Sequence, residues 1–357
     1  MRKNTIPGSG RPASRAMTRD KSAHLGYTRG MDVVTLGELI LDMFASEAGK
    51  DFQTVSAFIP VAGGAPANVA VAVSKLGARA AFIGKVGEDA FGRRLESVLK
   101  GYGVETRGMR FDRQHRTTLN FMTIPDPNRT EMLFYRNPGA DMLLAPDELD
   151  QRLLASTAAY HFGSVSLAVE PCRSAALEGA AFAREKGALV SFDVNYRPSL
   201  WENDARAKAE IVEALPRADI VKVNETELRL LSGTDDAPAG CAKILEWGPA
   251  LCVATLGPHG SAWAARGSAG RVQGFAVDVV DATGCGDAFM AALLVRLLST
   301  VGGRTDNRRS LLEGLKKDDL ADALRWANAA GALTARRKGV MPALPDATEV
   351  RQLIIGA

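Results

Sequence analysis

The sequence predicts an α/β fold with a mainly parallel central sheet, and two observations lead to this prediction. From Val33 onward, short β-branched or apolar runs that end in Gly or Asp alternate with helical stretches. Two segments, 42–62 and 110–136, interrupt this alternation with short strand patterns and turn residues such as Asp126-Pro127-Asn128. We therefore expect a sheet covered by helices on both faces, with a small antiparallel lid attached to it.

Each element follows from its local pattern. β-branched and apolar runs predict strands at 33–37, 80–84, 189–193, 220–224 and 251–257. Apolar residues at helical spacing predict helices at 66–76, 89–101, 172–186, 202–214, 225–232 and 287–299. No linker rich in Pro or Ser divides residues 31–357, so we expect one main domain that carries the lid as an insertion.

Polar residues follow several of the expected strands. Ligands of parallel sheets bind at the carboxyl ends of the strands, because the connecting loops and helix N-termini meet there. Candidate groups at this edge are Asp42, Asp193, Asn195, Asn224 and Asp287. The sequence therefore predicts that residues far apart along the chain form one site.

Charge is distributed unevenly along the 357 residues, whose net charge is +3. The first 30 residues hold seven Lys and Arg and one Asp, so this segment is strongly basic and the remainder is slightly acidic. The basic balance of the whole is thus no argument for nucleic-acid binding by the body. We expect residues 1–30 to form a disordered tail, and a transit peptide, an added extension and an overlong gene start remain open as its origin.

Four cysteines are present, at positions 172, 241, 252 and 285. They form no C-x-x-C pair, and no histidine cluster has metal-ligand spacing, so a zinc site is not expected. Reduced thiols are typical of a cytoplasmic protein, which is the expected location. No apolar stretch reaches the length that spans a bilayer, and no membrane partner is expected.

The segment from Asp281 to Asp287 carries the strongest chemical signal. Gly284 and Gly286 allow a tight turn whose amides point at one spot, and a helix that starts there adds the positive end of its dipole. Asp287 would stand beside this anion hole and could take the proton of a hydroxyl that attacks a bound phosphate. An ordinary glycine turn with a capping Asp is the alternative for this segment taken alone.

A second segment, Gly63-Gly64-Ala65-Pro66-Ala67-Asn68, leads into an expected helix. The glycine pair lets the backbone approach a ligand, and Asn68 offers a donor and an acceptor to a hydroxyl. A plain helix start with Pro66 in its first turn is the alternative. The segment therefore predicts a sugar-binding turn only together with the other motifs.

Two more segments favour a nucleotide. Asn224 and Glu227 lie three residues apart on one helical face and could hold a hydrated Mg²⁺, although a helix-capping arrangement has the same spacing. Residues 328–332 are small, so a flat ring could lie against them, although close helix packing would also explain this composition. Both interpretations stay open for each segment.

Together, in this order, these segments resemble the PfkB, or ribokinase-like, family of carbohydrate kinases. Residues 63–92 look like the family's N-terminal signature, and residues 281–292 look like its C-terminal signature. Segments 37–42, 134–142 and 338–345 look most like the fructokinases. The resemblance implies a ribokinase-like three-layer sandwich. It also implies an ATP-dependent kinase for the primary hydroxyl of a ketohexose, with conversion of D-fructose to fructose 6-phosphate as the favoured reaction.

The resemblance also implies roles for matching residues. Asp287 would be the general base, and amides of residues 282–286, including Gly284, Cys285 and Gly286, would hold the γ-phosphate. The implied sugar ligands are Asp42, Gly63, Gly64, Asn68, Arg136 and Asp287 itself. The implied nucleotide ligands are Asn224, Thr255, Gly257, Gly260, Asn328 and the two glycines of the anion hole. Asn224 and Glu227 would organise Mg²⁺ through water, and Asp281 and Thr283 match a loop that holds K⁺ in many members.

The implied partners are a small sugar and ATP, and paired lids imply a homodimer.

One departure from the family pattern is Cys285, which stands where Ala is usual. A thiol at a helix N-terminus is expected to have either a lowered pKa or the inert character of a buried group. The other is Ala282, where Thr is common, and it should matter little if only the backbone is used.

The sequence leaves three other functions to compare with this one. A kinase for another sugar or sugar acid, such as 2-keto-3-deoxygluconate, fits the same motifs. A non-catalytic scaffold of the same fold would not need the intact Asp287 and its glycines. A dehydrogenase is disfavoured because Gly37 is followed by Glu38 rather than by a dinucleotide-binding glycine pattern. A P-loop kinase is excluded because the sequence has no Gly-Lys-Ser/Thr motif.

Overall fold

The structure is a computed structural model, and it describes residues 30–126, 129–301 and 307–357. The predicted tail therefore lies outside the described residues except for Gly30, as do two residues of the turn expected at 126–128. None of the helices in the described ranges has the length and hydropathy that crossing a bilayer requires.

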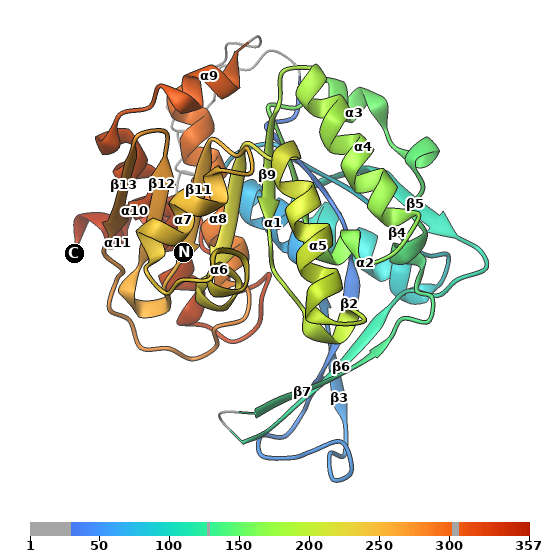
Figure 1. The fold of residues 1–357 in the computed structure, drawn as a ribbon. Coiled ribbons are helices and arrows are strands. Elements are labelled where there is room, and N and C mark those ends of the chain that lie inside the picture. The colour runs from blue at the N-terminus through green and yellow to red at the C-terminus, as the bar shows by residue number, and fades with distance from the viewer. Residues whose placement is uncertain (1–29, 127–128, 302–306) are drawn as a thin grey trace, which may run out of the picture.

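Nine strands of the described chain form the central sheet, in the order β13-β12-β11-β10-β9-β8-β1-β4-β5 (Figure 1). They are β1 Val33–Leu36, β4 Ala80–Gly87, β5 Glu105–Asp112, β8 Ala159–Gly163, β9 Leu189–Asp193, β10 Ile220–Asn224, β11 Leu251–Thr255, β12 Ser261–Ala265 and β13 Ser268–Val272. All neighbours from β11 to β5 are parallel, and β12 and β13 add an antiparallel edge. The prediction of a mainly parallel sheet is confirmed.

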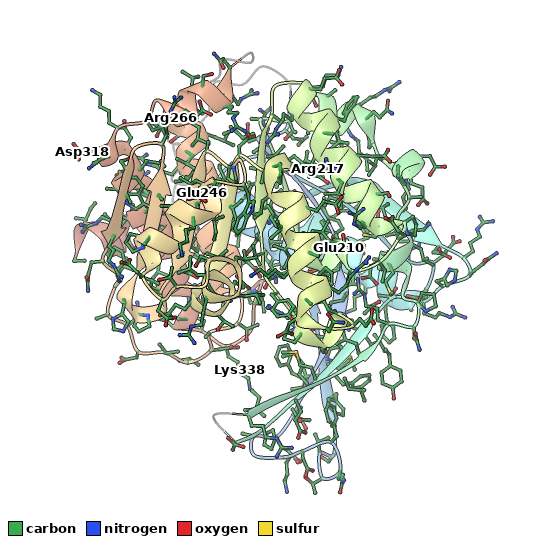
Figure 2. All side chains as sticks on the ribbon, in the orientation of Figure 1. Glu210, Arg217, Glu246, Arg266, Asp318 and Lys338 are labelled. Atoms are coloured by element: carbon green, nitrogen blue, oxygen red, sulfur yellow. The ribbon has the colours of Figure 1, made fainter. Side chains whose placement is uncertain are left out.

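Helices pack on both faces of this sheet and give three layers. On one face lie α1 Ala65–Lys75, α2 Ala90–Gly101, α8 Cys285–Val301, α9 Arg308–Glu313, α10 Lys317–Ala335 and α11 Ala347–Ile355. On the other face lie α3 Gln151–Ala155, α4 Cys172–Glu185, α5 Asp204–Ala214, α6 Glu225–Ser232 and α7 Ala237–Leu245. Charged side chains such as Arg266, Asp318 and Lys338 remain exposed at the periphery (Figure 2).

A second, four-stranded sheet projects from the body as the lid (Figure 1). Its strands, in the order β3-β2-β6-β7, are β3 Phe58–Gly63, β2 Ile40–Ala45, β6 Leu119–Asp126 and β7 Arg129–Tyr135. The outer pairs are antiparallel, as expected for the lid, and the central pair of β2 and β6 runs parallel. The reason is that β2 follows β1 and β6 follows β5, and β1 and β5 leave the body in the same direction.

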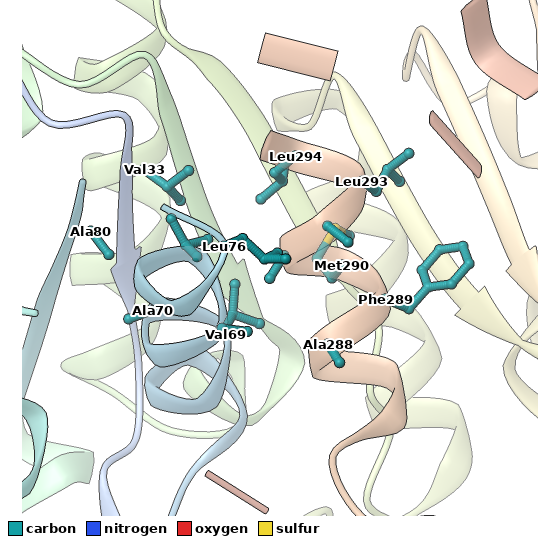
Figure 3. Packing of buried hydrophobic residues seen from close by; sticks show 14 of the residues in the cluster. Val33, Val69, Ala70, Leu76, Ala80, Ala288, Phe289, Met290, Leu293 and Leu294 are labelled. Carbon is teal, nitrogen blue, oxygen red and sulfur yellow. The ribbon is translucent and has the colours of Figure 1, made fainter. Parts of the chain in front are cut away.

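The hydrophobic core aligns the two helices that begin at the predicted site. Val69 and Ala70 of α1 and Ala288 and Met290 of α8 belong to one buried cluster, and Figure 3 shows the two helices side by side. Small residues on α1 permit this close approach. As a result, the first turns of α1 and α8 meet at the carboxyl edge of the sheet.

Candidate active site

Asp287 lies in the first turn of α8, and its carboxylate is only 9% exposed. The Nδ2 amide of Asn68, in α1, donates a hydrogen bond of 2.8 Å to Oδ2 of Asp287. The turn before α8 requires glycine, since Gly284 has a φ of +82° and a Cβ there would lie 2.6 Å from a methyl group of Val340. The packing of α1 on α8 therefore joins the two predicted motifs in one contact.

The anion hole is predicted at the backbone amides that precede and begin α8. The amide of Thr283 donates to Asp281 at 2.9 Å, and the amide of Cys285 donates to the carbonyl of Ala282 at 3.3 Å. These two amides are thus already paired within the loop. Because the first amides of a helix have no partner inside it, we expect Gly284 and Gly286 to supply the donors to an anion.

Asp42 lies in lid strand β2 and is buried. The Nδ2 amide of Asn120, in β6, donates to Oδ1 of Asp42 over 2.8 Å. Gly63 leaves the space that the other oxygen occupies, since a Cβ on Gly63 would lie 1.9 Å from Oδ2. Sequence reasoning missed Asn120, and only the register that pairs it with Asp42 reveals it.

The turn at Gly64 matches the plain helix start, and sugar binding by this segment stays a prediction. Gly64 has a φ of +110°, and a Cβ there would lie 2.3 Å from the carbonyl oxygen of Glu38. Pro66 occupies the first turn of α1, as the plain helix start predicts. The Glu38 carboxylate accepts a 2.8 Å hydrogen bond from the amide of Ala65, and burial raises the pKa of Glu38 to about 7. The segment is therefore a capped helix start that also places Gly63, Gly64 and Asn68 together.

Arg136 follows lid strand β7 and is engaged within the protein. Its guanidinium forms an ion pair with Asp141 at 2.7 Å, and both side chains are almost fully buried. Thr118 also donates to Asp141. A contact between Arg136 and the sugar stays a prediction, because in this structure its nearest anion is Asp141.

Asn224 and Glu227 form the capping arrangement that was the alternative for their motif. Oδ1 of Asn224 accepts from the amide of Glu227 at 2.9 Å, and Oε2 of Glu227 accepts from the amide of Asn224 at 2.8 Å. Oε1 of Glu227 accepts from the amide of Tyr196 at 2.8 Å. Both carboxylate oxygens are thus occupied and buried, which fits Mg²⁺ contact through water rather than direct coordination. The described residues contain no group of three or more His, Cys, Asp or Glu that could hold a metal.

A buried ion pair lies beneath the start of α8. The Nζ of Lys222, in β10, donates to both oxygens of Asp193, in β9, at 2.9 and 2.8 Å. Burial lowers the pKa of Lys222, but the charges of Asp193, Glu227 and Asp287 outweigh it and the net shift is upward. Sequence reasoning gave Lys222 no role because it lies inside an apolar strand run.

Two of the predicted nucleotide residues, Gly260 and Asn328, lie at the end of β13. Gly260 has a φ of +89°, and a Cβ there would lie 2.2 Å from the carbonyl oxygen of Val272. The Nδ2 amide of Asn328 donates to the carbonyls of Val272 and Gln273, both at 3.2 Å.

Farther along the same edge, Thr255 closes β11 and Gly257 has a φ of +54°. The side-chain oxygen of Thr255 donates to Val223 at 3.4 Å. A Cβ on Gly257 would meet nothing within 4 Å, so this glycine is required for its backbone conformation alone.

The loop predicted to hold K⁺ is closed by Asp281. One carboxylate oxygen accepts from Thr283 at 2.9 Å and the other accepts from the amide of Gly339 at 3.2 Å. The carboxylate thereby ties the loop before α8 to the segment after α10. These bonds leave further lone pairs on the carboxylate, which is a donor type that alkali cations accept.

Of the two expectations for Cys285, the inert buried thiol fits the structure and the lowered pKa does not. Burial, followed by the neighbouring charges of Asp281 and Asp287, raises the pKa of this thiol to about 12. Two carboxylates near the thiol oppose a thiolate more strongly than the helix N-terminus favours it. Cys285 is therefore the inert thiol of the alternative interpretation.

Burial raises the pKa of Asp42 and of Asp287 to about 6 each, while the Asn120 and Asn68 amides act in the opposite direction. The charged groups that face Asp287 are Asp193 and Lys222 from the sheet, Arg197 from the loop after β9, and Asp42 from the lid. Arg197 was not predicted either. Because the carboxylates interact, their titration belongs to the pair rather than to either residue.

If Asp287 is the base, its ionisation sets the acidic limb of the pH dependence of kcat/KM. We expect kcat/KM to rise with an apparent pKa near 6, above the ordinary carboxyl range, because proton transfer needs the ionised form. Asn68→Leu removes a donor that lowers the pKa of Asp287, so the limb should move to higher pH. An unchanged limb in this variant would show that Asp287 is not the titrating group.

The same raised pKa values make the free energy of unfolding fall as pH rises, whereas kcat/KM rises with pH. Between pH 4 and 6 the folded state binds more protons at Asp42 and Asp287 than the unfolded state does. Their contribution to the free energy of unfolding is therefore present at low pH and lost as pH rises through this window.

The fold and the site together define a class of protein. The site has a buried carboxylate beside a helix N-terminus, at the carboxyl edge of a parallel sheet and below a lid. This arrangement suits an enzyme that transfers a phosphoryl group to a hydroxyl. The pfkB family carbohydrate kinase model matches residues 31–347, and the chain belongs to this family. The resemblance drawn from the sequence motifs is confirmed.

Relatives support the same class. The chain is 43% identical over 324 residues to Fructokinase-1 of Zea mays, covering 90% of this chain and 97% of that one. It resembles the fructokinase structure from Xylella fastidiosa with bound ATP at a TM-score of 0.82 and 31% identity, covering 91% and 98% of the two chains. It also resembles Vibrio cholerae fructokinase with fructose, ADP and calcium at a TM-score of 0.77 and 33% identity, covering 91% and 99%. A double mutant of the Vibrio enzyme, with fructose, ADP and potassium, gives the same TM-score, identity and coverage.

Proposed function

We propose that the protein is an ATP-dependent fructokinase that converts D-fructose to fructose 6-phosphate. The observation that carries this proposal is the Asp287 carboxylate, buried, held by Asn68 and adjacent to the glycine turn at the start of α8. The fructokinases among its relatives, and the ATP and fructose in their structures, favour this substrate pair. Fructose as the acceptor rests on those relatives, whereas phosphoryl transfer rests on the site.

The chemistry follows from the positions of the groups. Asp42, Gly63, Gly64 and Asn68 would hold the sugar so that its O6 hydroxyl lies next to Asp287. Asp287 takes the hydroxyl proton, the new O–P bond forms at the γ-phosphorus, and the bond to the ADP oxygen breaks. The amides of Gly284 and Gly286 would stabilise the charge on the transferring group.

The other predicted residues would complete the site. Asn224, Glu227, Thr255, Gly257, Gly260 and Asn328 would surround the nucleotide. Mg²⁺, held through water near Asn224 and Glu227, would neutralise phosphate charge, and K⁺ at Asp281 and Thr283 would do so behind the anion hole. The lid would close over the sugar and exclude water, which limits hydrolysis of ATP.

The exposed surface of the lid leads to a proposal for the assembly of the protein. The lid exposes several large apolar side chains, and burying such side chains against a second copy would favour association. They include Ile59, Ile124, Met132, Leu133 and Tyr135. We propose a homodimer through the lid in the cytoplasm. Sedimentation velocity of wild type and Leu133→Asp tests the dimer, which is excluded if the wild type sediments as a monomer at micromolar concentration.

The test of the function is ADP release with Mg²⁺ and ATP over a panel of sugars, with and without K⁺. Fructose should give the highest kcat/KM, and K⁺ should increase it. A preference for 2-keto-3-deoxygluconate would replace the proposed acceptor. Absence of sugar-dependent ADP release over the whole panel would favour a scaffold that keeps the fold without the activity.

A further inference from the structure

The buried pair Lys222–Asp193 has no assigned role, although it lies at the centre of the site. Lys222 is 5% exposed and Asp193 is 2% exposed. A buried ion pair is weak support for stability, because removing two charges from water offsets most of their attraction. Its position therefore calls for an explanation other than holding β9 to β10.

The geometry places the ammonium group against the catalytic helix. A Cβ built on Gly286 would lie 3.1 Å from Nζ of Lys222, which is closer than ordinary contact. Glycine at this position thus gives the ammonium room beside the first turn of α8. Two of the three ammonium donors are taken by Asp193, so the group is fixed in place.

The charges around the pair also point to the site. Asp193, Glu227 and Asp287 are all buried carboxylates whose charges act on Lys222. A triphosphate would bring more negative charge to the same edge of the sheet. Lys222 supplies a fixed positive charge from below the amides of α8, where the low dielectric makes it effective.

We propose that Lys222, fixed by Asp193, is a positioning residue that holds a positive charge beneath the anion hole and so favours the terminal phosphate of ATP and its transfer. The proposal deepens the function proposed above and rests on it for the turnover measurements. Lys222 acts through the backbone of Gly286 and through the local potential. Asp193 sets the location of the ammonium.

The decisive experiment separates a charge needed for transfer from a pair needed for folding. Lys222→Met removes the charge, and the double variant Lys222→Met with Asp193→Val removes the whole pair without leaving a buried charge. We expect both to lower kcat by about 100-fold, the size seen when one stabilising donor is removed from such a site. The double variant should recover most of the melting temperature that Lys222→Met loses, because it leaves no unpaired carboxylate.

Nucleotide affinity gives a readout that does not need a sugar. Calorimetry should show that Lys222→Met weakens the binding of ATP more than that of ADP, since the proposal places the terminal phosphate nearest the ammonium. Asp193→Asn, which keeps the ammonium but removes its counter-charge, should change the ATP-to-ADP preference in the opposite direction. If the pair were purely structural, the ATP-to-ADP preference would change in the same direction in both variants.

Lys85→Met is the matched control, because Lys85 also forms a half-buried ion pair, with Glu148 at 2.8 Å, but lies on β4 away from α8. It should leave the ATP-to-ADP preference unchanged. Recovery of kcat to within about fivefold of wild type in the double variant would overturn the proposal. So would equal losses of ATP and ADP affinity in Lys222→Met. If the wild type phosphorylates no sugar but binds ATP, the proposed function fails, and the affinity ratios still decide the role of Lys222.

Discussion

Asp287→Ala should lower kcat by about 10³-fold or more while the Kd for ATP stays within about threefold of wild type. The carboxylate is the predicted base at the start of α8, and the alanine variant lacks this acceptor for the proton of the attacking hydroxyl. ATP would still meet the amides of Gly284 and Gly286, because these belong to the backbone. Steady-state kinetics and calorimetry measure the two quantities.

Asp287→Asn is the control for folding in this experiment. The asparagine oxygen can still accept the hydrogen bond from Asn68, so the contact between α1 and α8 remains. It has no basic oxygen, and its kcat should fall about as far as that of the alanine variant. Turnover close to wild type in either variant would remove Asp287 from the role of base.

Gly63→Ala should raise the KM for the sugar by about 100-fold and leave the Kd for ATP nearly unchanged. A Cβ at this position would lie 1.9 Å from Oδ2 of Asp42, so the carboxylate must leave its place beside Asn120. A displaced Asp42 would lose the charge-assisted hydrogen bonds to the sugar that are proposed for it, and each bond of this kind contributes about 1.5–3 kcal/mol. The nucleotide residues lie on other elements and do not feel this change.

Gly101→Ala provides the comparison for a glycine-to-alanine change as such. A Cβ on Gly101, at the end of α2, meets nothing within 4 Å. Its KM for the sugar should equal that of wild type, and its melting temperature should change little. If Gly63→Ala shows the same unchanged KM, Asp42 does not bind the sugar in the position described.

Much of the fold follows from local pattern. The strands expected at 189–193 and 220–224 and the helix expected at 225–232 have the observed bounds, because each is a short run with a clear polar or glycine boundary. The antiparallel edge formed by β12 and β13 was not predicted. Its residues are small and weakly patterned, so their pairing depends on the neighbouring β11 rather than on their own periodicity.

The site divides in the same way. Gly284, Gly286 and Asp287 are neighbours in the sequence, so their local pattern was enough to predict a site. Asn120 and Arg197 were not predicted, since neither lies near a motif and each is brought to the carboxylates only by the lid register or by a loop of the body. For Asn224 and Glu227 the sequence left both helix capping and Mg²⁺ binding open. Only the structure shows that both carboxylate oxygens of Glu227 accept hydrogen bonds from backbone amides.

By itself, the sequence determined the alternation of strands and helices, the glycine turns and the identity of the acid at the start of α8, because these depend on neighbours within a few residues. Tertiary structure alone decided which distant groups meet. Asn68 reaches Asp287 across 219 positions, and Lys222 lies beside Gly286, through helix packing on a shared sheet edge. It also decided the direction of the Cys285 and Asp287 pKa shifts, since burial and the charges of remote residues, not local sequence, set the stability of each ionised form.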